Sequence, residues 1–191
     1  MPPLVLASTS RYRAQLLARL GLAFDVARPD VDERPLAHES PASLALRLAA
    51  AKAEAIAATR ADALVLGSDQ VASCEGRILG KPGTREAAIA QLQLMSGREA
   101  VFLTAVALAG PGAAVDQALD TTTVRFRSFG VDEITRYVDA ESPLDCAGSF
   151  KSEGLGIVLF EAIDSRDPTA LVGLPLIATA RLLRARGVLL P

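Results

Sequence analysis

Short apolar runs of strand length recur along the chain and alternate with helix-length segments. Residues 4–7 and 63–66 are continuous apolar stretches of the kind found in buried strands. Residues 24–27 form a third such segment. Later in the chain, the pattern predicts a hairpin over 71–79 turning at Glu75-Gly76, two long strands over 98–108 and 118–128, and a strand over 157–160.

Helical periodicity and capping residues fill the intervals between these strands. Ser40 followed by Pro41 is typical of a helix start, and the Ala-rich pattern continues to about Thr59. Further helices are predicted over 11–20, over 84–95 after Thr84 as cap, over 131–140, and from Pro175 onward. Strands and helices in this order indicate an α/β fold, a mixed β-sheet flanked by helices.

Length and composition favour a single domain over residues 1–191. Half of the 191 residues are hydrophobic and 22% are charged, and we find no internal repeat, low-complexity segment or linker. Aromatic residues make up 4% of the chain and Trp is absent. We therefore expect a core built from Ala, Leu, Val and Ile.

Charge and rare residues exclude several classes of function. The net charge of −2 and the pI of about 5.5 argue against a general nucleic-acid binder but leave room for a small anionic ligand. One histidine, His38, argues against a histidine metal site or a Ser-His-Asp triad. Cys74 and Cys146 form no CxxC motif, and no apolar run is long enough to span a bilayer. We expect a cytoplasmic protein with no membrane segment.

The segment Ser8-Thr9-Ser10-Arg11-Tyr12-Arg13 stands where a predicted strand passes into a helix. Free N–H groups and the positive end of the helix dipole make such a turn suited to anions, and Arg13 adds a guanidinium matched to phosphate. The alternative is an ordinary serine cap beside solvated arginines.

Lys52 shares a helix face with Leu44, Leu48 and Ile56. A lysine in an apolar stripe costs stability unless its head reaches solvent at the helix edge or meets an anion. The sequence leaves both interpretations open, the second of which places a cation in a cleft.

Carboxylates and a further cation complete the candidate chemistry. Asp69 follows the buried strand 63–66, and ligands collect at the carboxyl ends of strands in α/β sheets, although a turn-capping role is the alternative. The acidic loop with Asp30, Asp32 and Glu33 offers a second carboxylate or is simply solvated. Lys81 lies in Gly80-Lys81-Pro82, which is not a Walker loop.

Together these residues match the needs of polyphosphate hydrolysis. Arg13, Lys52 and Lys81 can neutralise the phosphates, while Asp69 and Glu33 can hold a hard divalent cation such as Mg²⁺ through oxygen. Asp69 can also act as the base that takes a proton from water.

In this order, the motifs are similar to those of the Maf-like nucleotide pyrophosphatases, over essentially the full length. The matching segments are Leu6-Ala7-Ser8-Thr9-Ser10 with Arg13 and Leu16-Leu17, Val31-Asp32-Glu33, Lys52, Gly67-Ser68-Asp69-Gln70-Val71, Gly80-Lys81-Pro82, residues 146–154 and Leu171-Val172-Gly173-Leu174-Pro175.

This resemblance implies two lobes with a central cleft, as in Maf and inosine-triphosphatase-like folds, and a homodimer. It also implies cleavage between the α and β phosphates of a nucleoside triphosphate with the help of a divalent metal, Mg or Mn. Asp69 matches the proton acceptor of the family. The residues matching its phosphate and metal site are Ser8, Arg13, Glu33, Lys52 and Lys81.

Three departures from the common family pattern resemble the branch that acts on 7-methyl-GTP. Tyr12 stands where most members have Arg, Gln70 where they have Thr, and Glu153 where they have Gln; the branch itself usually has Trp at position 12. An aromatic face attracts the cationic methylated base by about 0.5–2 kcal/mol, and a carboxylate is a charge-assisted acceptor for the guanine edge. We therefore expect Tyr12, Gln70 and Glu153 to select 7-methyl-GTP.

Two other functions compete with this interpretation. The first is a dTTP/UTP or mixed-nucleotide pyrophosphatase, if the departures are drift at an exposed lip. The second, from a different class, is a nucleotide-binding regulator of cell division in which turnover is incidental. An Asp69→Asn variant separates hydrolysis from binding.

Overall fold

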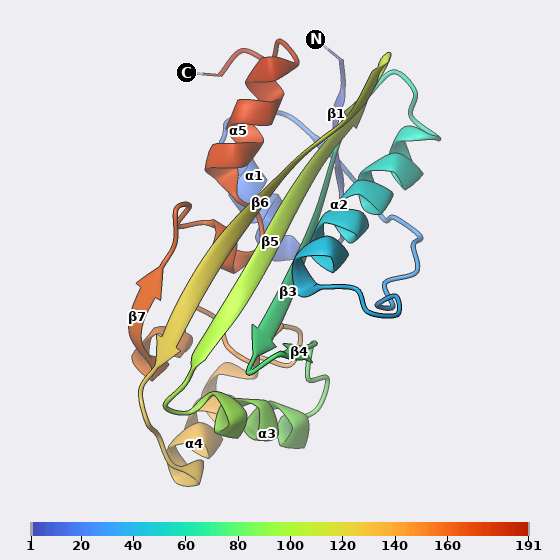
Figure 1. The fold of residues 1–191 in the computed structure, drawn as a ribbon. Helices are drawn as coiled ribbons and strands as arrows, with labels where there is room; N and C mark the ends of the chain where they lie inside the picture. Colours follow the sequence, from blue (N-terminus) through green and yellow to red (C-terminus); the bar gives the residue numbers. More distant parts are fainter. Residues whose placement is uncertain (1, 191) are drawn as a thin grey trace. The chain divides into compact units, whose positions relative to one another are not determined.

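A seven-stranded mixed sheet forms the framework of the chain, which the computed structural model describes over residues 2–190. The strand order is β2-β1-β3-β5-β6-β7, with β4 paired to β3 (Figure 1). β1 runs parallel to β2 and β3, whereas the β3–β4 and β6–β7 pairs are antiparallel. The strands are β1 Leu4–Ala7, β2 Asp25–Ala27, β3 Leu64–Cys74, β4 Arg77–Leu79, β5 Glu99–Gly110, β6 Ala113–Phe126 and β7 Phe160–Asp164.

The helices begin where the capping residues predict. The side chains of Ser10, Ser40 and Thr84 each accept a hydrogen bond from a first-turn N–H, and Pro41 opens α2. The α-helices are α1 Arg11–Ala18, α2 Pro41–Ala57, α3 Arg85–Met95, α4 Val131–Glu141 and α5 Leu176–Ala185, with short 3-10 helices η1 Leu155–Leu159 and η2 Ala170–Val172. The predicted α/β fold with a mixed sheet flanked by helices is therefore confirmed. None of the helices within 2–190 has the length and apolar character needed to cross a membrane.

The chain divides into two compact units, in agreement with the two predicted lobes. The first comprises Met1–Gln70, Thr104–Asp120 and Asp167–Pro191, and the second comprises Val71–Leu103 and Thr121–Arg166. Strands β3, β5 and β6 each contribute residues to both units, so neither unit is one continuous stretch of sequence. The single domain and the cleft stay predictions, and each unit is described by itself below.

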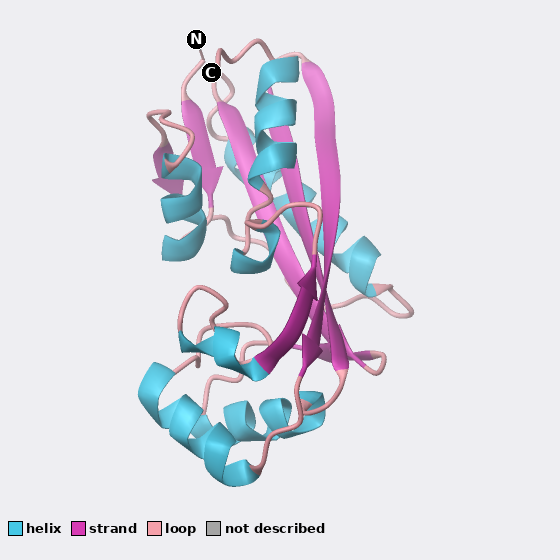
Figure 2. Cartoon of the chain, turned by 90° about the vertical axis from the view of Figure 1, so that its left-hand side faces the viewer, coloured by secondary structure: helices cyan, strands magenta, loops and turns pink. Residues whose placement is uncertain are grey.

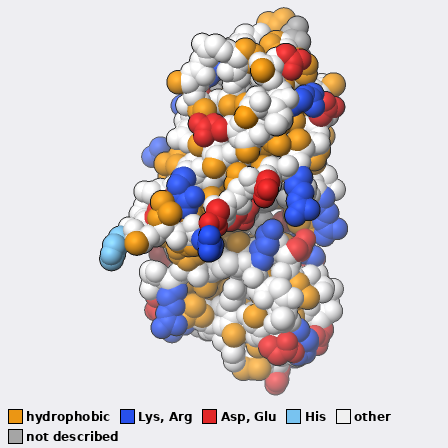
Figure 3. All heavy atoms as spheres, turned by 90° about the vertical axis from the view of Figure 1, so that its right-hand side faces the viewer, with side chains coloured by type: hydrophobic (Ala, Val, Ile, Leu, Met, Phe, Trp, Pro, Cys, Tyr) orange, Lys and Arg blue, Asp and Glu red, His pale blue; other side chains and the backbone are white. Residues whose placement is uncertain are grey.

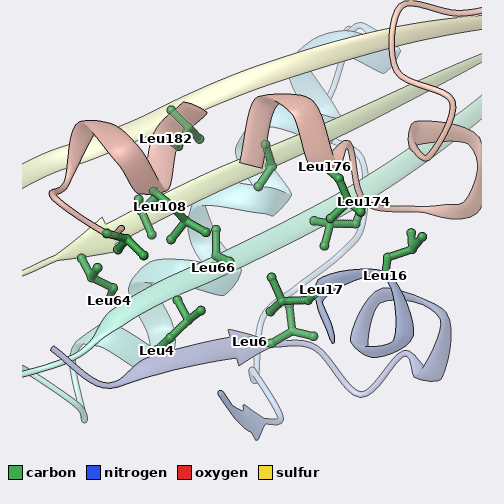
Figure 4. Close-up of a cluster of buried hydrophobic side chains, with 13 residues drawn as sticks. Leu4, Leu6, Leu16, Leu17, Leu64, Leu66, Leu108, Leu174, Leu176 and Leu182 are labelled. Carbon is green, nitrogen blue, oxygen red and sulfur yellow. The ribbon is translucent and has the colours of Figure 1, made fainter. Parts of the chain in front are cut away.

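Side chains of the first unit alternate between two faces of its strands. Leu4, Leu6, Leu64 and Leu66 lie in a cluster with leucines of α1, the 174–176 segment and α5 (Figure 4). Successive residues of a strand point to opposite faces, so Val5, Ala7, Val65 and Gly67 face the other way. Gly67 meets α2 on that face. The alternation fixes the direction of every side chain that follows along β3.

The second unit has an aromatic centre and two packed helices, α3 and α4, which lie side by side (Figures 1 and 2). Phe102, Phe126, Phe150 and Phe160 meet edge to face, with ring centroids 5.0–5.5 Å apart. Although the aromatic content is only 4%, the phenylalanines are concentrated here, in contrast to the aliphatic core that the composition predicts.

Two sequence-based predictions of strands are wrong. The segment 157–160 is mostly the 3-10 helix η1, because Gly156 lies against the Lys151 carbonyl, where a Cβ would be 2.4 Å from its oxygen, and the chain turns tightly there. The strand predicted over 63–66 does not end before Asp69, because β3 continues to Cys74 by pairing with β4 and β5 after β1 has ended.

Charged side chains of both signs are interspersed on the face of the molecule drawn in Figure 3. Basic and acidic groups alternate there over short distances, which agrees with the small net charge of −2. Any concentration of charge for an anionic ligand must therefore be local.

Candidate functional site

The close approach of α2 to β3 brings a lysine to an aspartate. Gly67 has no side chain, and a Cβ placed there would lie 2.1 Å from the Ala49 carbonyl oxygen and 2.7 Å from the Ala53 nitrogen. Only glycine therefore lets the helix backbone come this near. Lys52 lies on the same helix face, and Asp69 lies two positions along the strand, on the same strand face as Gly67.

Lys52 joins two carboxylates. Its Nζ lies 2.7 Å from Asp69 Oδ1 and 2.6 Å from Glu33 Oε1. The Lys52 side chain is 7% exposed and that of Asp69 11%, whereas that of Glu33 is 61% exposed. The lysine thus meets anions instead of reaching solvent, which settles the choice that the sequence left open. An ammonium has three N–H donors, so one remains for a ligand oxygen.

Asp69 keeps one oxygen available. Oδ1 is bound by Lys52, and Oδ2 has no hydrogen bond to any of residues 2–190. No buried side-chain oxygen or nitrogen in that part of the chain lacks a partner, so Oδ2 keeps some contact with solvent although Asp69 is largely buried. This carboxylate is held in place through one oxygen and can accept a proton at the other.

Arg13, which Ser8 contacts, is a second cation beside these carboxylates. Arg13 Nε donates to the Gly173 carbonyl at 2.9 Å, and Nη1 lies 3.4 Å from Ser8 Oγ. The Ser10 N–H donates to Ser8 Oγ at 3.2 Å, which shapes the turn between β1 and α1. The Gly173 carbonyl fixes the guanidinium, leaving the remaining N–H groups for an anion.

The electrostatics of Arg13 place it near both acids. Burial lowers the pKa of the Arg13 guanidinium, because the charged head has lost water, while the charges of Asp69 and Glu33 oppose that shift. A partly dehydrated cation next to the buried Asp69 carboxylate is suited to bind an anionic ligand, since its interactions are screened less than on an open surface.

The loop that carries Glu33 is anchored by Arg47 of α2. The Arg47 guanidinium donates to both Glu39 oxygens, at 2.7 and 2.8 Å, and to the Arg34 carbonyl at 3.1 Å. It holds the pKa of Glu39 well below its usual range, at about 2. Asp32 is engaged by Arg34 instead, so Glu33 is the acid of this loop that reaches Lys52.

Gln70 lies on the opposite face of β3 from Asp69, as its position next to Asp69 requires. Its amide nitrogen lies 3.0 Å from Thr104 Oγ1, 3.1 Å from the Ala170 carbonyl and 3.0 Å from the Leu171 carbonyl. Gln70 therefore holds η2 through its nitrogen, and its carbonyl oxygen is the group left for a ligand. Base selection by Gln70 stays a prediction.

Tyr12 stands on α1 with Arg11 over its ring. The Arg11 guanidinium carbon is 4.8 Å from the ring centroid, and Arg11 Nη2 donates to the Tyr12 hydroxyl at 2.8 Å. The ring thus already binds a cation by its face.

Ser8, Arg13, Glu33, Lys52 and Asp69 are therefore brought together on the first unit. Lys81 and Glu153 belong to the second unit, where both are exposed, and their convergence with the other five stays a prediction. Lys81 lies in the loop between β4 and α3, which is held by hydrogen bonds to the Gly80 carbonyl and from the Gly83 N–H.

Glu33 and Asp69 fit a magnesium-type ion whose remaining coordination positions are filled by the bound ligand and water. Magnesium in nucleotide enzymes is usually held by one or two carboxylates together with phosphate oxygens and water. Glu33 and Asp69 supply two carboxylates that converge on one nitrogen. Among residues 2–190 there is no group of three or more His, Cys, Asp or Glu side chains that would form a closed metal cage.

Several contributors to the site escape sequence-based reasoning. Thr104 and the carbonyls of residues 170–173 are polar partners of the site, and each is distant in sequence from the residue that it holds. Ser68, which is fully buried, places its hydroxyl 2.8 Å from the Ala105 carbonyl and 3.1 Å from the Gly173 carbonyl. Among these, Ser68, Leu171 and Gly173 lie within motifs that the sequence analysis singled out, whereas Thr104 and Ala170 have no signal in the sequence.

The chain is similar to several known proteins. A protein named 7-methyl-GTP pyrophosphatase from Xanthomonas oryzae pv. oryzae is 62% identical over 191 residues, covering 100% of both chains. One of the same name from Aromatoleum aromaticum is 58% identical over 189 residues, covering 98% of this chain and 97% of its own. The solved structure of the Staphylococcus aureus Ham1 protein is similar with a TM-score of 0.49 and 21% identity, covering 79% of this chain and 88% of its own.

The sequence profile of the Maf-like protein family matches residues 3–186. That range includes every residue assigned above to the candidate site. The chain therefore belongs to the Maf-like protein family.

Proposed function

We propose that this protein hydrolyses 7-methyl-GTP to 7-methyl-GMP and pyrophosphate. The observation that carries the proposal is the buried Lys52 ammonium held between Asp69 and Glu33, with Arg13 beside them. Relatives that match over their full length bear the name of this activity.

The phosphates are bound by positively charged side chains. The free N–H groups of Arg13 and the third donor of Lys52 bind phosphate oxygens, Ser8 supports Arg13, and Lys81 adds a further cation. These groups stabilise negative charge that moves onto the leaving pyrophosphate, which is where preorganised donors contribute most to the rate.

Asp69 acts as the general base. Its Oδ2 accepts a proton from water as the water oxygen bonds to the α-phosphorus. The bond from the α-phosphorus to the bridging oxygen breaks, and the electron pair leaves with pyrophosphate. Because Lys52 fixes Oδ1, the carboxylate cannot turn away from the attacking water.

A divalent cation, Mg or Mn, completes the site. Glu33 and Asp69 would hold it, and the bound ion would neutralise phosphate charge during the reaction. The hard oxygen donors and their convergence on a single cationic group support this assignment.

The base is selected by Tyr12, Gln70 and Glu153. The cation already stacked on the Tyr12 ring supports a role in binding the positively charged methylguanine. The Gln70 carbonyl oxygen and the Glu153 carboxylate serve as acceptors for the N–H groups of the guanine edge.

The oligomer and location form part of the same proposal. We expect a homodimer, supported by the apolar side chains of η1, in which Leu155, Ile157 and Val158 are 49%, 53% and 54% exposed. Light scattering of the purified protein tests it. Neither Cys74 nor Cys146 forms a disulfide, which supports a cytoplasmic location, and we expect no nucleic-acid partner.

A nucleotide panel tests the proposed reaction. Purified protein is incubated with Mg²⁺ or Mn²⁺ and with 7-methyl-GTP, GTP, dTTP or UTP, and both pyrophosphate and single phosphate are measured. We expect pyrophosphate with the highest kcat/KM for 7-methyl-GTP. Release of single phosphate, or faster turnover of dTTP and UTP, would refute the assignment.

A further inference from the structure

Glu141, the last residue of α4, contacts the loop 149–155 on both sides of Glu153. On the earlier side, Lys151 Nζ donates to the Glu141 carbonyl at 2.8 Å and lies 3.4 Å from Glu141 Oε1. On the later side, the Leu155 N–H donates to Glu141 Oε2 at 2.6 Å. One residue therefore ties down both ends of the short segment that carries Glu153.

The ion pair between Lys151 and Glu141 is largely shielded from water. The side chains of Lys151 and Glu141 are 14% and 16% exposed, in contrast to the exposed Glu153 between them. A nearly buried ion pair with hydrogen bonds to backbone restricts movement more than a surface pair does. The segment 151–155 is thus fixed at its ends, while Glu153 between them is exposed to solvent.

The residues before Lys151 are anchored as well. The Phe150 ring packs edge to face against Phe102, Phe126 and Phe160, and Ser149 Oγ donates to the Gln91 side chain at 2.6 Å. The Lys151 N–H donates to the Tyr137 hydroxyl at 3.1 Å, a second contact with α4. Glu153 therefore projects from a loop whose backbone has little freedom.

Two glycines show how closely the loop fits. A Cβ on Gly154 would lie 2.6 Å from Glu141 Oε2, and a Cβ on Gly156 would lie 2.4 Å from the Lys151 carbonyl oxygen. A side chain at 154 would have to displace the Glu141 carboxylate. The contact with Glu141 can therefore be disturbed without removing any charge.

We propose that Glu141 and Lys151 are positioning residues that set nucleotide selectivity by holding Glu153. The inference rests on the proposed role of Glu153 as an acceptor for the methylated base. A hydrogen-bonding group discriminates between ligands only while it is held in place, because a mobile carboxylate can turn to solvent. Neither Glu141 nor Lys151 needs to touch the nucleotide.

The test measures kcat/KM for 7-methyl-GTP and for UTP in variants of the full chain. For Glu141→Ala and for Gly154→Ala, we expect the selectivity ratio to fall by about tenfold, which corresponds to about 1.4 kcal/mol. The loss is expected in KM for 7-methyl-GTP, with kcat and the UTP reaction little changed. Lys151→Arg, which keeps the charge, should retain more selectivity than Lys151→Met.

Asp139→Ala is the matched control. It removes a carboxylate from the same helix, where Asp139 pairs with Arg85, and it should leave the selectivity ratio unchanged. Thermal unfolding of each variant identifies any that fail to fold, and Gly154→Ala and Lys151→Met serve as independent substitutes for Glu141→Ala.

Glu153→Gln separates this inference from the proposed function. If Glu153→Gln lowers selectivity while Glu141→Ala, Gly154→Ala and Lys151→Met do not, the positioning role is wrong. If Glu153→Gln leaves selectivity unchanged, the assignment of Glu153 itself fails. A uniform fall in kcat for both nucleotides in the Glu141 and Gly154 variants would also overturn the inference.

Discussion

The two units of the protein hold their candidate ligand-binding groups in different ways. On the first unit, Lys52 binds both Asp69 and Glu33, and the Lys52 side chain is only 7% exposed. On the second unit, Lys81 and Glu153 are exposed, and it is their loops that are held, by backbone and side-chain contacts. The position of the buried groups therefore depends on the folding of the first unit, whereas the position of Lys81 and Glu153 depends on the conformation of their loops.

This difference predicts how substitutions will act. A change in the buried cluster should alter stability as well as activity, because a buried charge that loses its partner is costly. A change at an exposed loop group should alter binding alone. The following variants break or sharpen that contrast, starting with the largest expected effect.

Asp69→Asn should lower the rate of hydrolysis by about 10²–10⁴-fold, since the general base is lost. Calorimetric titration should still show binding of 7-methyl-GTP, because the phosphate cations remain. Loss of binding together with turnover would assign Asp69 to the ligand site and not to proton transfer.

Lys52→Met should destabilise the fold by about 3–5 kcal/mol, because Asp69 is left buried without its cation. Urea unfolding measures the change. Arg34→Ala is the control, since its pair with Asp32 has side chains 87% and 60% exposed; it should cost far less stability, because solvent screens the pair. Equal effects would mean that burial does not distinguish the two pairs.

Lys81→Ala should leave unfolding unchanged and raise KM for the nucleotide by about tenfold, as expected for loss of one charge-assisted contact. Steady-state kinetics with 7-methyl-GTP gives the value. Arg77→Ala removes an exposed cation from neighbouring β4 and should have no such effect; if both variants behave alike, the contribution is general charge.

The loop with Glu33 should respond to acid through Glu39. Because the pKa of Glu39 is lowered to about 2 from 4.5, its pairing with Arg47 stabilises the fold above about pH 4.5. That contribution is lost as the pH falls through about 2. In urea unfolding, Glu39→Gln should therefore have a lower free energy of unfolding than wild type at neutral pH, and this difference should shrink in acid. A difference in free energy that stays constant with pH would contradict the lowered pKa.

Arg11→Met should have the smallest effect, a gain of about two- to fivefold in affinity for 7-methyl-GTP. The substitution uncovers the Tyr12 ring that Arg11 now occupies, and cation–π contacts at exposed sites contribute about 0.5–1 kcal/mol. Titration with GTP, whose base is uncharged, should show a weaker response. A larger gain for GTP would argue against stacking of a cation.

Much of the buried cluster could be predicted from the sequence because it follows periodic structure. The spacing of Lys52 with Leu44 and Leu48 places it on the inner face of α2, and Ser40 with Pro41 fixes the start of that helix. The strand character of residues before Asp69 was also visible, although the strand end was not. Both features depend on neighbours within a few residues.

The remaining features depend on contacts that no local pattern encodes. Gln70 binds the carbonyls of Ala170 and Leu171, a separation of about 100 residues along the chain. Gly67 is needed only because a distant helix backbone lies against it. The strand predicted over 157–160 failed for a different reason, since the close contact of Gly156 with the nearby Lys151 backbone overrides its apolar pattern.

The most direct test of the central claim follows the oxygen of the attacking water. Hydrolysis of 7-methyl-GTP in water enriched in heavy oxygen, followed by mass spectrometry of both products, shows which phosphorus is attacked. The arrangement of Asp69 beside the phosphate cations predicts one heavy oxygen in 7-methyl-GMP and none in pyrophosphate. Label in pyrophosphate, or release of single phosphate instead, would contradict the account.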